Sequence, residues 1–228
     1  MILMGKFIVI EGLDGSGKTT QGKLLASRLR SEGYRVRELS FPCYGEKSAC
    51  LVEMYLSGAL GSSPSDTNGY AASMLYAADR YISFVTDWKK DVEDDGCIVL
   101  ATRYTTANAY HQLSKLEREE WEDFLSWLYD FEFGKLGLPR PDSVILLAMS
   151  QELSSGKVAD RSAATGQQMD IHEKDREYLL RCSEAARFAA AADGWHVVEC
   201  APEGELLPIE EINDKIRAAI SPLLVNNN

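Results

Sequence analysis

The chain has 228 residues, of which 45% are hydrophobic, and this is enough for one α/β domain with a large core. A formal net charge of −11 argues against a polymeric nucleic-acid partner, although one cationic pocket would still suffice for a nucleotide. The five cysteines have irregular spacings and no C-x-x-C pair, so we expect reduced thiols in a cytoplasmic protein. We expect neither a signal peptide nor a membrane span.

The first predicted elements enclose a phosphate-binding motif. An apolar run over 7–10 predicts a buried strand, and leucines at helical spacing predict a helix over 20–30. Residues 12–19 between them read G-x-x-x-x-G-K-T, a complete P-loop, whose backbone N–H groups would surround phosphate oxygens. Lys18 adds a mobile positive charge, and Thr19 can hold a magnesium ion. The motif predicts a nucleoside triphosphate site formed by Gly12, Leu13, Asp14, Gly15, Ser16, Gly17, Lys18, Thr19 and Thr20.

Helical and strand patterns alternate along the rest of the chain. Strands are predicted over 35–39, 97–101, 143–149 and 195–200. Helices are predicted over 70–90, 117–134, 173–192 and 208–223, and a short helix with a loop over 45–61. Short apolar strands separated by helices imply a five-stranded parallel sheet flanked by helices, the three-layer α/β fold of P-loop NTPases. The chain shows no repeat and no linker, so we expect a single domain over 1–228.

The polar stretch 154–169 is rich in small residues and includes glycines. It is either an ordinary surface loop or a mobile lid, and its length favours the lid.

Three further segments can form a second pocket, which a phosphoryl-transfer kinase needs for its acceptor. Residues 41–44 follow the second strand, at the carboxyl edge where ligands of open α/β sheets bind. Tyr76 and Arg80 are four residues apart on one helical face, so the ring can stack on a base while the guanidinium donates to its edge. The segment after the third strand contributes Arg103, Asn108, His111 and Gln112.

In this order and spacing, these segments resemble the thymidylate kinase family, the nucleoside monophosphate kinases that phosphorylate dTMP with ATP. The matching pieces are IEGLDGSGKTTQ at 10–21, FPCY at 41–44, MLYAADRY at 74–81, RYTTANAYHQ at 103–112, GLPRPDSVILL at 137–147 and DIHEKD at 170–175. The resemblance implies in-line phosphoryl transfer from ATP to dTMP with Mg²⁺, a role in dTTP biosynthesis, and a homodimer.

The resemblance also implies roles for individual residues at the phosphates. Lys18 and the P-loop would hold the ATP phosphates, and Asp14 would lie near the acceptor's 3′-hydroxyl and phosphate. Arg103 would clamp the acceptor phosphate and stabilise charge during transfer. The acceptor phosphate site would be shaped by Phe41, Pro42 and Tyr44, and the metal would be held by Thr19, Asp14 and Glu173.

At the acceptor's base, the resemblance implies that Tyr76 stacks on thymine and Arg80 donates to its O4 edge. Asn108 would read the polar edge of the base. His111 falls where the family often carries a tyrosine beside the sugar, where it would disfavour a ribose 2′-hydroxyl, and Gln112 follows it.

Two departures from the family pattern bear on catalysis. The third strand ends in Thr102-Arg103-Tyr104, where the family has Asp-Arg-Tyr, so Glu11, Asp14 or Glu173 must replace the missing carboxylate or turnover is slow. The P-loop also lacks an arginine that some relatives carry. Lys157 and Arg161 in the predicted lid are then the candidates for supplying that catalytic charge.

Three alternatives stay open on the sequence. The first is a kinase acting on another nucleotide or nucleoside, and the second is a weakly active P-loop sensor, supported by Thr102 alone. The third is a motor or partition ATPase that needs no acceptor, against which the Tyr76, Arg80 and Asn108 pocket argues.

Overall fold

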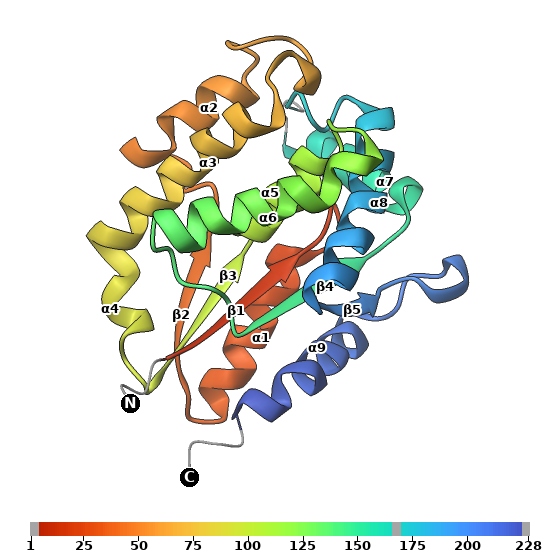
Figure 1. Ribbon diagram of the computed structural model, residues 1–228. Coiled ribbons are helices and arrows are strands. Elements are labelled where there is room, and N and C mark those ends of the chain that lie inside the picture. The colour runs from red at the N-terminus through yellow and green to blue at the C-terminus, as the bar shows by residue number, and fades with distance from the viewer. Residues whose placement is uncertain (1–4, 166–169, 225–228) are drawn as a thin grey trace.

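Five strands form one sheet in the order β2-β3-β1-β4-β5 in the computed structural model, which describes residues 5–165 and 170–224 (Figure 1). They are β1 (Lys6–Glu11), β2 (Arg35–Ser40), β3 (Cys97–Thr102), β4 (Ser143–Ala148) and β5 (His196–Glu199). Every pairing is parallel. The predicted three-layer α/β fold with a five-stranded parallel sheet is therefore confirmed.

The helices agree with the predicted ranges except at two places. They are α1 (Lys18–Ser31), α2 (Cys50–Leu56), α3 (Gly69–Ser83), α4 (Lys89–Val92), α5 (Thr105–Leu113), α6 (Trp121–Tyr129), α7 (Gln151–Thr165), α8 (Arg176–Asp193) and α9 (Ile209–Leu224). Two π-helical segments, η3 (Phe84–Trp88) and η5 (Asp130–Lys135), continue α3 and α6, and short 3-10 turns occupy Lys47–Ala49, Pro64–Asp66, Arg118–Glu120 and Pro202–Gly204. The sequence analysis did not predict α5, and α7 replaces a predicted loop.

Of the two alternatives for 154–169, the ordinary surface loop is wrong for the described part, because 154–165 is helical, while the favoured alternative, a lid, stays a prediction. The sequence KVADRSAA within it contains mostly good or neutral helix formers, so Gly156 alone does not stop the helix. Ser154 and Val158 are buried and give the helix one packed face. Residues 166–169 lie outside the described part of the structure.

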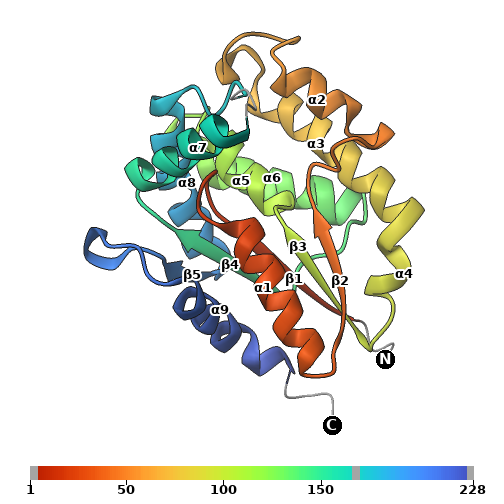
Figure 2. The same ribbon diagram turned by 180° about the vertical axis from the view of Figure 1, so that it is seen from behind.

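Helices cover both faces of the sheet, because alternate side chains of each strand point to opposite faces. Phe7 and Val9 of β1 join a core cluster with α5, α6 and α8 on one face. Ile8 and Ile10 join a second cluster with α1 and α9 on the other face (Figure 2). A third cluster lies between α2 and α3. In the described residues, no helix is both long and apolar enough to cross a membrane.

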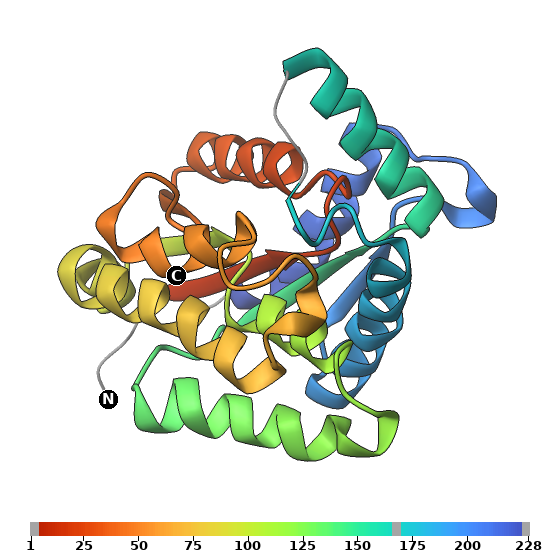
Figure 3. The ribbon, with the colours of Figure 1, turned by 90° about the horizontal axis from the view of Figure 1, so that it is seen from above.

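The carboxyl edge of the sheet brings the predicted site segments together. The P-loop follows β1, residues 41–44 follow β2, and Arg103 follows β3. Since β1 lies between β3 and β4, the strand order reverses at β1, which is the position where open α/β sheets bind ligands. Seen from above, α7 (teal) and the α2–α3 segment (orange) lie on different sides of this edge (Figure 3).

Candidate functional site

A cleft of about 1020 Å³ lies at this carboxyl edge. Pockets for one drug-sized ligand hold roughly 300–1,000 Å³, so the cleft has room for two ligands. The predicted site residues that line it are Asp14, Gly15, Gly17, Lys18, Thr19, Thr20, Phe41, Pro42, Tyr44, Tyr76, Arg80, Arg103, Asn108, His111 and Glu173.

Among the predicted site residues whose side chains the structure describes, four are not part of that lining. Gly12 and Leu13 contribute backbone carbonyls just behind the cleft, as described below, and Ser16 is buried. Gln112 is fully buried on α5 and donates to Asn108 Oδ1 over 3.4 Å. Arg161 lies within α7, and its side chain is outside the described part of the structure.

The P-loop backbone is arranged so that glycine is required. Gly12, Gly15 and Gly17 have φ values of 148°, 82° and 88°, a region that other residues rarely adopt. A Cβ on Gly15 would lie 2.1 Å from the carbonyl oxygen of Ser154, so the loop is in direct contact with α7. Gly17 is the N-cap of α1 and has no side chain to cap the first N–H groups. The loop therefore presents backbone donors to an anion.

Lys18 folds back onto the loop that precedes it. Its Nζ donates to the carbonyl oxygens of Gly12 at 2.8 Å and Leu13 at 2.7 Å. The same atom is 3.9 Å from Asp14 Oδ1. The ammonium is thus held at the mouth of the P-loop, where a phosphate would meet it.

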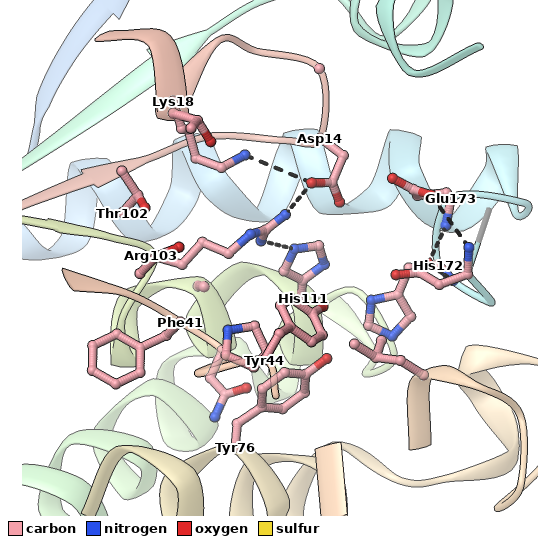
Figure 4. A pocket seen from close by; sticks show the side chains of 18 of the residues that line it. Asp14, Lys18, Phe41, Tyr44, Tyr76, Thr102, Arg103, His111, His172 and Glu173 are labelled. Atoms are coloured by element: carbon pink, nitrogen blue, oxygen red, sulfur yellow. Dashed lines mark hydrogen bonds and ion pairs between the residues drawn. The ribbon is translucent and has the colours of Figure 1, made fainter. Parts of the chain in front are cut away.

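Asp14 links the P-loop to the loop after β3. Arg103 Nη2 donates to Asp14 Oδ1 over 2.5 Å, so the Asp14 carboxylate lies between Lys18 and Arg103 (Figure 4). Burial raises the pKa of Asp14, but the charges of Arg103 and Lys18 outweigh burial and hold that pKa well below its usual range. The Asp14 carboxylate therefore contacts two cations, Lys18 of the P-loop after β1 and Arg103 of the loop after β3.

His111 lies on the other side of Arg103 as a neutral ring. Burial and then the Arg103 charge lower the His111 pKa well below its usual 6.5. Its Nε2 lies 3.0 Å from Arg103 Nη1 and accepts from it, because an arginine can only donate. The proton then sits on Nδ1, which lies 3.2 Å from the hydroxyl of Tyr178. This tautomer keeps Arg103 aimed into the cleft without adding positive charge.

The part of the cleft where the sequence analysis expects the acceptor's base, here called the base end, is formed by α3 and α5. Tyr76 is half-buried and extends from α3 toward His111, and its ring meets Tyr55 edge-to-face at 6.1 Å (Figure 4). Arg80 is buried on the same helix, and Asn108 is buried on α5. The sequence analysis expected Tyr76, Arg80 and Asn108 to share one pocket, and all three line this cleft.

Several residues at the site were missed by the sequence analysis. His172 is buried, its ring stacks on His111 at a centroid distance of 5.3 Å, and its Nε2 lies 2.8 Å from the Tyr55 hydroxyl. Asp170 lines the cleft beside it. The signal was present, because both belong to the DIHEKD segment that already drew attention to Glu173.

Glu132, in η5, is the other missed residue. Its carboxylate is fully buried and receives two hydrogen bonds from the Arg80 guanidinium, at 2.7 and 2.6 Å. It is four residues beyond Leu128 on the apolar face of the predicted 117–134 helix. An acidic residue at an apolar-face position was the signal that could have found it.

Glu11 does not face the cleft. It is fully buried and accepts from the Tyr104 N–H at 2.9 Å, the Thr106 hydroxyl at 2.6 Å and the Tyr110 hydroxyl at 2.9 Å. Burial raises its pKa, although the Thr106 hydrogen bond and the Arg103 charge oppose this. Glu11 thus anchors the loop after β3 to β1. Of the carboxylates considered as substitutes for the missing one at Thr102, Asp14 and Glu173 line the cleft.

The predicted metal ligands fit magnesium better than a structural metal. Thr19, Asp14 and Glu173 provide oxygen donors along the cleft. Within 5–165 and 170–224, no cluster of at least three His, Cys, Asp or Glu side chains could hold a metal ion. Mg²⁺ needs no such cluster, because it is bound through one or two carboxylates, waters and substrate phosphates. The donor set is compatible with that mode.

Comparisons with known proteins identify relatives of this chain. The family model described as Thymidylate kinase matches residues 10–215. A thymidylate kinase of Mycobacterium tuberculosis (strain CDC 1551 / Oshkosh) is 34% identical over 190 residues, which cover 82% of this chain and 86% of that protein. A probable thymidylate kinase of Thermococcus gammatolerans is 31% identical over 192 residues, covering 79% and 84%. One from Pyrobaculum aerophilum is 27% identical over 218 residues, covering 92% and 97%.

Proposed function

The chain belongs to the thymidylate kinase family, and from this premise we propose that it transfers a phosphoryl group from ATP to dTMP, giving ADP and dTDP. The observation that carries the proposal is the meeting of two cations from opposite sides of one cleft. Lys18 reaches it from the P-loop and Arg103 from the loop after β3, and both contact Asp14. Each cation suits one phosphate-bearing ligand.

ATP would bind with its phosphates on the P-loop. The backbone donors ahead of α1 and the Lys18 ammonium would hold the phosphates in line with the acceptor. Positioning two reactants in this way can supply about 7–11 kcal/mol of the barrier reduction. Little acid–base chemistry is needed, because phosphoryl transfer depends mainly on position and charge.

The acceptor phosphate would bind at Arg103, bordered by Phe41, Pro42 and Tyr44. An arginine acting on a transferred phosphoryl group is worth about a thousandfold or more in rate. Tyr76 would then stack on the thymine ring, and neutral His111 would lie beside the sugar. Lys18 and Arg103 would then share their positive charge between the phosphates and the Asp14 carboxylate that both contact in the structure.

Magnesium would be held by the Thr19 hydroxyl with Asp14 or Glu173. When bound, it would neutralise charge on the transferred phosphate. Thr102 would contribute a hydroxyl where relatives place a carboxylate, so Asp14 and Glu173 would carry the remaining negative charge near the metal.

We propose that α7 supplies the additional positive charge. Its first turn touches the P-loop through Ser154, and Lys157 lines the cleft. The test is the kcat of Arg161→Ala, with Lys157→Ala alongside. We expect a substantial fall in kcat for Arg161→Ala. Wild-type turnover in that variant would contradict a catalytic role for Arg161.

An ADP-release assay over dTMP, dUMP, dCMP, dGMP and thymidine tests the proposed reaction. Fastest turnover with dTMP supports it, and faster turnover with another acceptor identifies a different nucleotide or nucleoside kinase. Tight binding of ATP and dTMP without turnover would favour the weakly active sensor that Thr102 suggests. ATP hydrolysis that needs no acceptor would contradict the kinase reading altogether.

We further propose a single-domain, cytoplasmic homodimer. An exposed apolar stripe on α3 and η3 supports the dimer; its residues are Tyr70, Met74, Tyr81, Ile82 and Val85. Free cysteines are in keeping with a reducing compartment. Sedimentation of the wild type against Met74→Glu tests the dimer, and an unchanged monomeric mass for both would contradict it.

A further inference from the structure

A single buried carboxylate, Glu132, lies behind the base end of the cleft and binds two of the residues that line it. Arg80 donates to it through Nε at 2.7 Å and Nη2 at 2.6 Å. Asn108 Nδ2 lies 3.3 Å from its Oε1, and the Thr105 hydroxyl donates to its Oε2 at 2.7 Å. Glu132 itself is fully buried and is not part of the cleft lining. Any effect it has on a ligand must therefore act through Arg80 and Asn108.

The two-point contact fixes the plane of the Arg80 guanidinium. Paired nitrogens on two carboxylate oxygens hold a rigid fork in one orientation. Nη1 is the nitrogen outside that fork, and its protein contact is a long one, 3.5 Å to the Tyr104 carbonyl. Because a guanidinium has no acceptor, Arg80 can only donate to a ligand in the cleft.

The same carboxylate sets the orientation of the Asn108 amide. Nδ2 lies 3.3 Å from both Glu132 Oε1 and the Ser73 carbonyl, and each of these atoms can only accept. The amide nitrogen is therefore committed to the protein. Oδ1 receives one weak bond, from Gln112 Nε2 at 3.4 Å, and keeps a second lone pair. Asn108 can thus offer a cleft ligand an acceptor.

We propose that Glu132 is the positioning residue that gives the base pocket its polarity, a donor from Arg80 beside an acceptor from Asn108. This pattern is complementary to a ring N–H next to a carbonyl, as in thymine and uracil. Cytosine has an amino group and an unprotonated ring nitrogen at the same positions. Its amino donor would meet the Arg80 donor, and its ring-nitrogen acceptor would meet the Asn108 acceptor, so the pattern disfavours cytosine. The inference rests on the proposed function, because it names what selects the acceptor of that reaction.

The sharpest test compares dUMP with dCMP, since these two acceptors differ only at the edge in question. The kcat/KM ratio of dUMP over dCMP is measured in wild type and in Glu132→Gln. The glutamine keeps the size of the side chain but presents an amide to Arg80 and Asn108, so we expect the ratio to fall at least tenfold, through the KM for dUMP. The dTMP over dUMP ratio, which reports the methyl group, should change less than threefold.

Asp130→Asn is the matched control, because Asp130 lies in the same π-helical segment, is exposed and contacts Lys135 instead. It should leave the dUMP over dCMP ratio unchanged. Thr105→Val covers the case that Glu132→Gln does not fold, since it removes one donor to Glu132 and leaves the Arg80 ion pair intact. There we expect a two- to fivefold fall in the ratio.

A structural role alone would lower both acceptors together and leave the ratio where it was. A wild-type ratio in Thr105→Val and in folded Glu132→Gln would overturn the inference while leaving the kinase assignment in place. Absence of dTMP and dUMP phosphorylation by the wild type would instead overturn the proposed function, and the inference with it.

Discussion

At the phosphate end of the cleft, the binding groups are backbone atoms of one continuous loop, ordered by Gly12, Gly15 and Gly17. At the base end, they are side chains from α3 and α5, held by a carboxylate in η5. In the proposed function, the first arrangement would bind the phosphates that all nucleoside triphosphates share. The second can distinguish one base from another, because its polarity depends on which side chains are fixed and how.

A buried carboxylate stands behind each end, but the two have different partners. Glu11 accepts from the Tyr104 N–H in the loop after β3 and from the Thr106 and Tyr110 hydroxyls of α5. Glu132 forms an ion pair with Arg80, both partners being almost completely buried. Removing one member of a buried ion pair leaves an uncompensated charge, so the base end is the more sensitive of the two to a single substitution.

Arg103→Ala should have the largest effect, because Arg103 is the cation proposed to hold the acceptor phosphate during transfer. We expect kcat/KM for dTMP to fall about 10³-fold or more, since the transferred charge loses its cation. Steady-state kinetics measures this, with Arg140→Ala as control, whose partner Asp193 lies outside the cleft. A loss of less than tenfold would show that Arg103 does not contact the reacting phosphate.

Lys18→Met should lower kcat without weakening dTMP binding, and so show that the two ends of the cleft act independently. Losing one preorganised cation at the reacting phosphate costs about 10²–10³-fold in kcat, whereas the proposed dTMP site lies elsewhere in the cleft. Calorimetric titration with dTMP should therefore give a dissociation constant within threefold of wild type. If dTMP affinity fell together with kcat, the two ends would not be independent.

Gly15→Ala against Gly33→Ala tests how far the phosphate end depends on backbone geometry. Both glycines have positive φ, 82° and 93°, but only at Gly15 would a Cβ meet another group, the Ser154 carbonyl. Backbone strain alone costs about 1–2 kcal/mol, so Gly33→Ala should lose that much unfolding free energy. Gly15→Ala should lose more and bind ATP over tenfold more weakly. Equal losses in urea unfolding would contradict the contact with α7.

His172→Gln should flatten the dependence of stability on pH. Burial, and then the Lys115 charge, lower the His172 pKa to about 3, so the folded protein holds this ring neutral. Its contribution is complete above the unfolded pKa of 6.5 and is lost as pH falls from 6.5 toward 3. Between about pH 7.5 and 5.5 the wild type should lose about 1.4 kcal/mol more unfolding free energy than the variant. Parallel urea-unfolding curves at both pH values would refute the assignment of a neutral ring.

Thr102→Asp should have the smallest effect, and it should preserve or raise activity. The new carboxylate would stand beside Arg103 at the end of β3, where the family resemblance implies an aspartate. The kcat with dTMP is the measurement, and Thr102→Asn separates charge from shape. A large loss in the aspartate variant alone would mean that this edge of the cleft is organised differently.

Sequence reasoning located the P-loop between its strand and helix, because this motif is contiguous along the chain. It missed α5 as a helix, since Thr105–Leu113 is buried throughout and shows no polar face to give a helical period. It also missed Glu132, whose contact with Arg80 spans 52 residues and whose contact with Asn108 spans 24. Residue spacing can show that Glu132 lies on the apolar face of a predicted helix. Its partners, Arg80 and Asn108, are distant in the sequence and are identified only in the folded structure.

The central claim is that two phosphate-bearing ligands meet between Lys18 and Arg103. A crystal structure with dTMP and a non-hydrolysable ATP analogue tests it most directly. We expect the dTMP phosphate beside Arg103, its ring on Tyr76, and the terminal phosphate of the analogue at Lys18, facing it in line. A pyrimidine bound away from Tyr76, with its phosphate directed away from Lys18, would contradict the account.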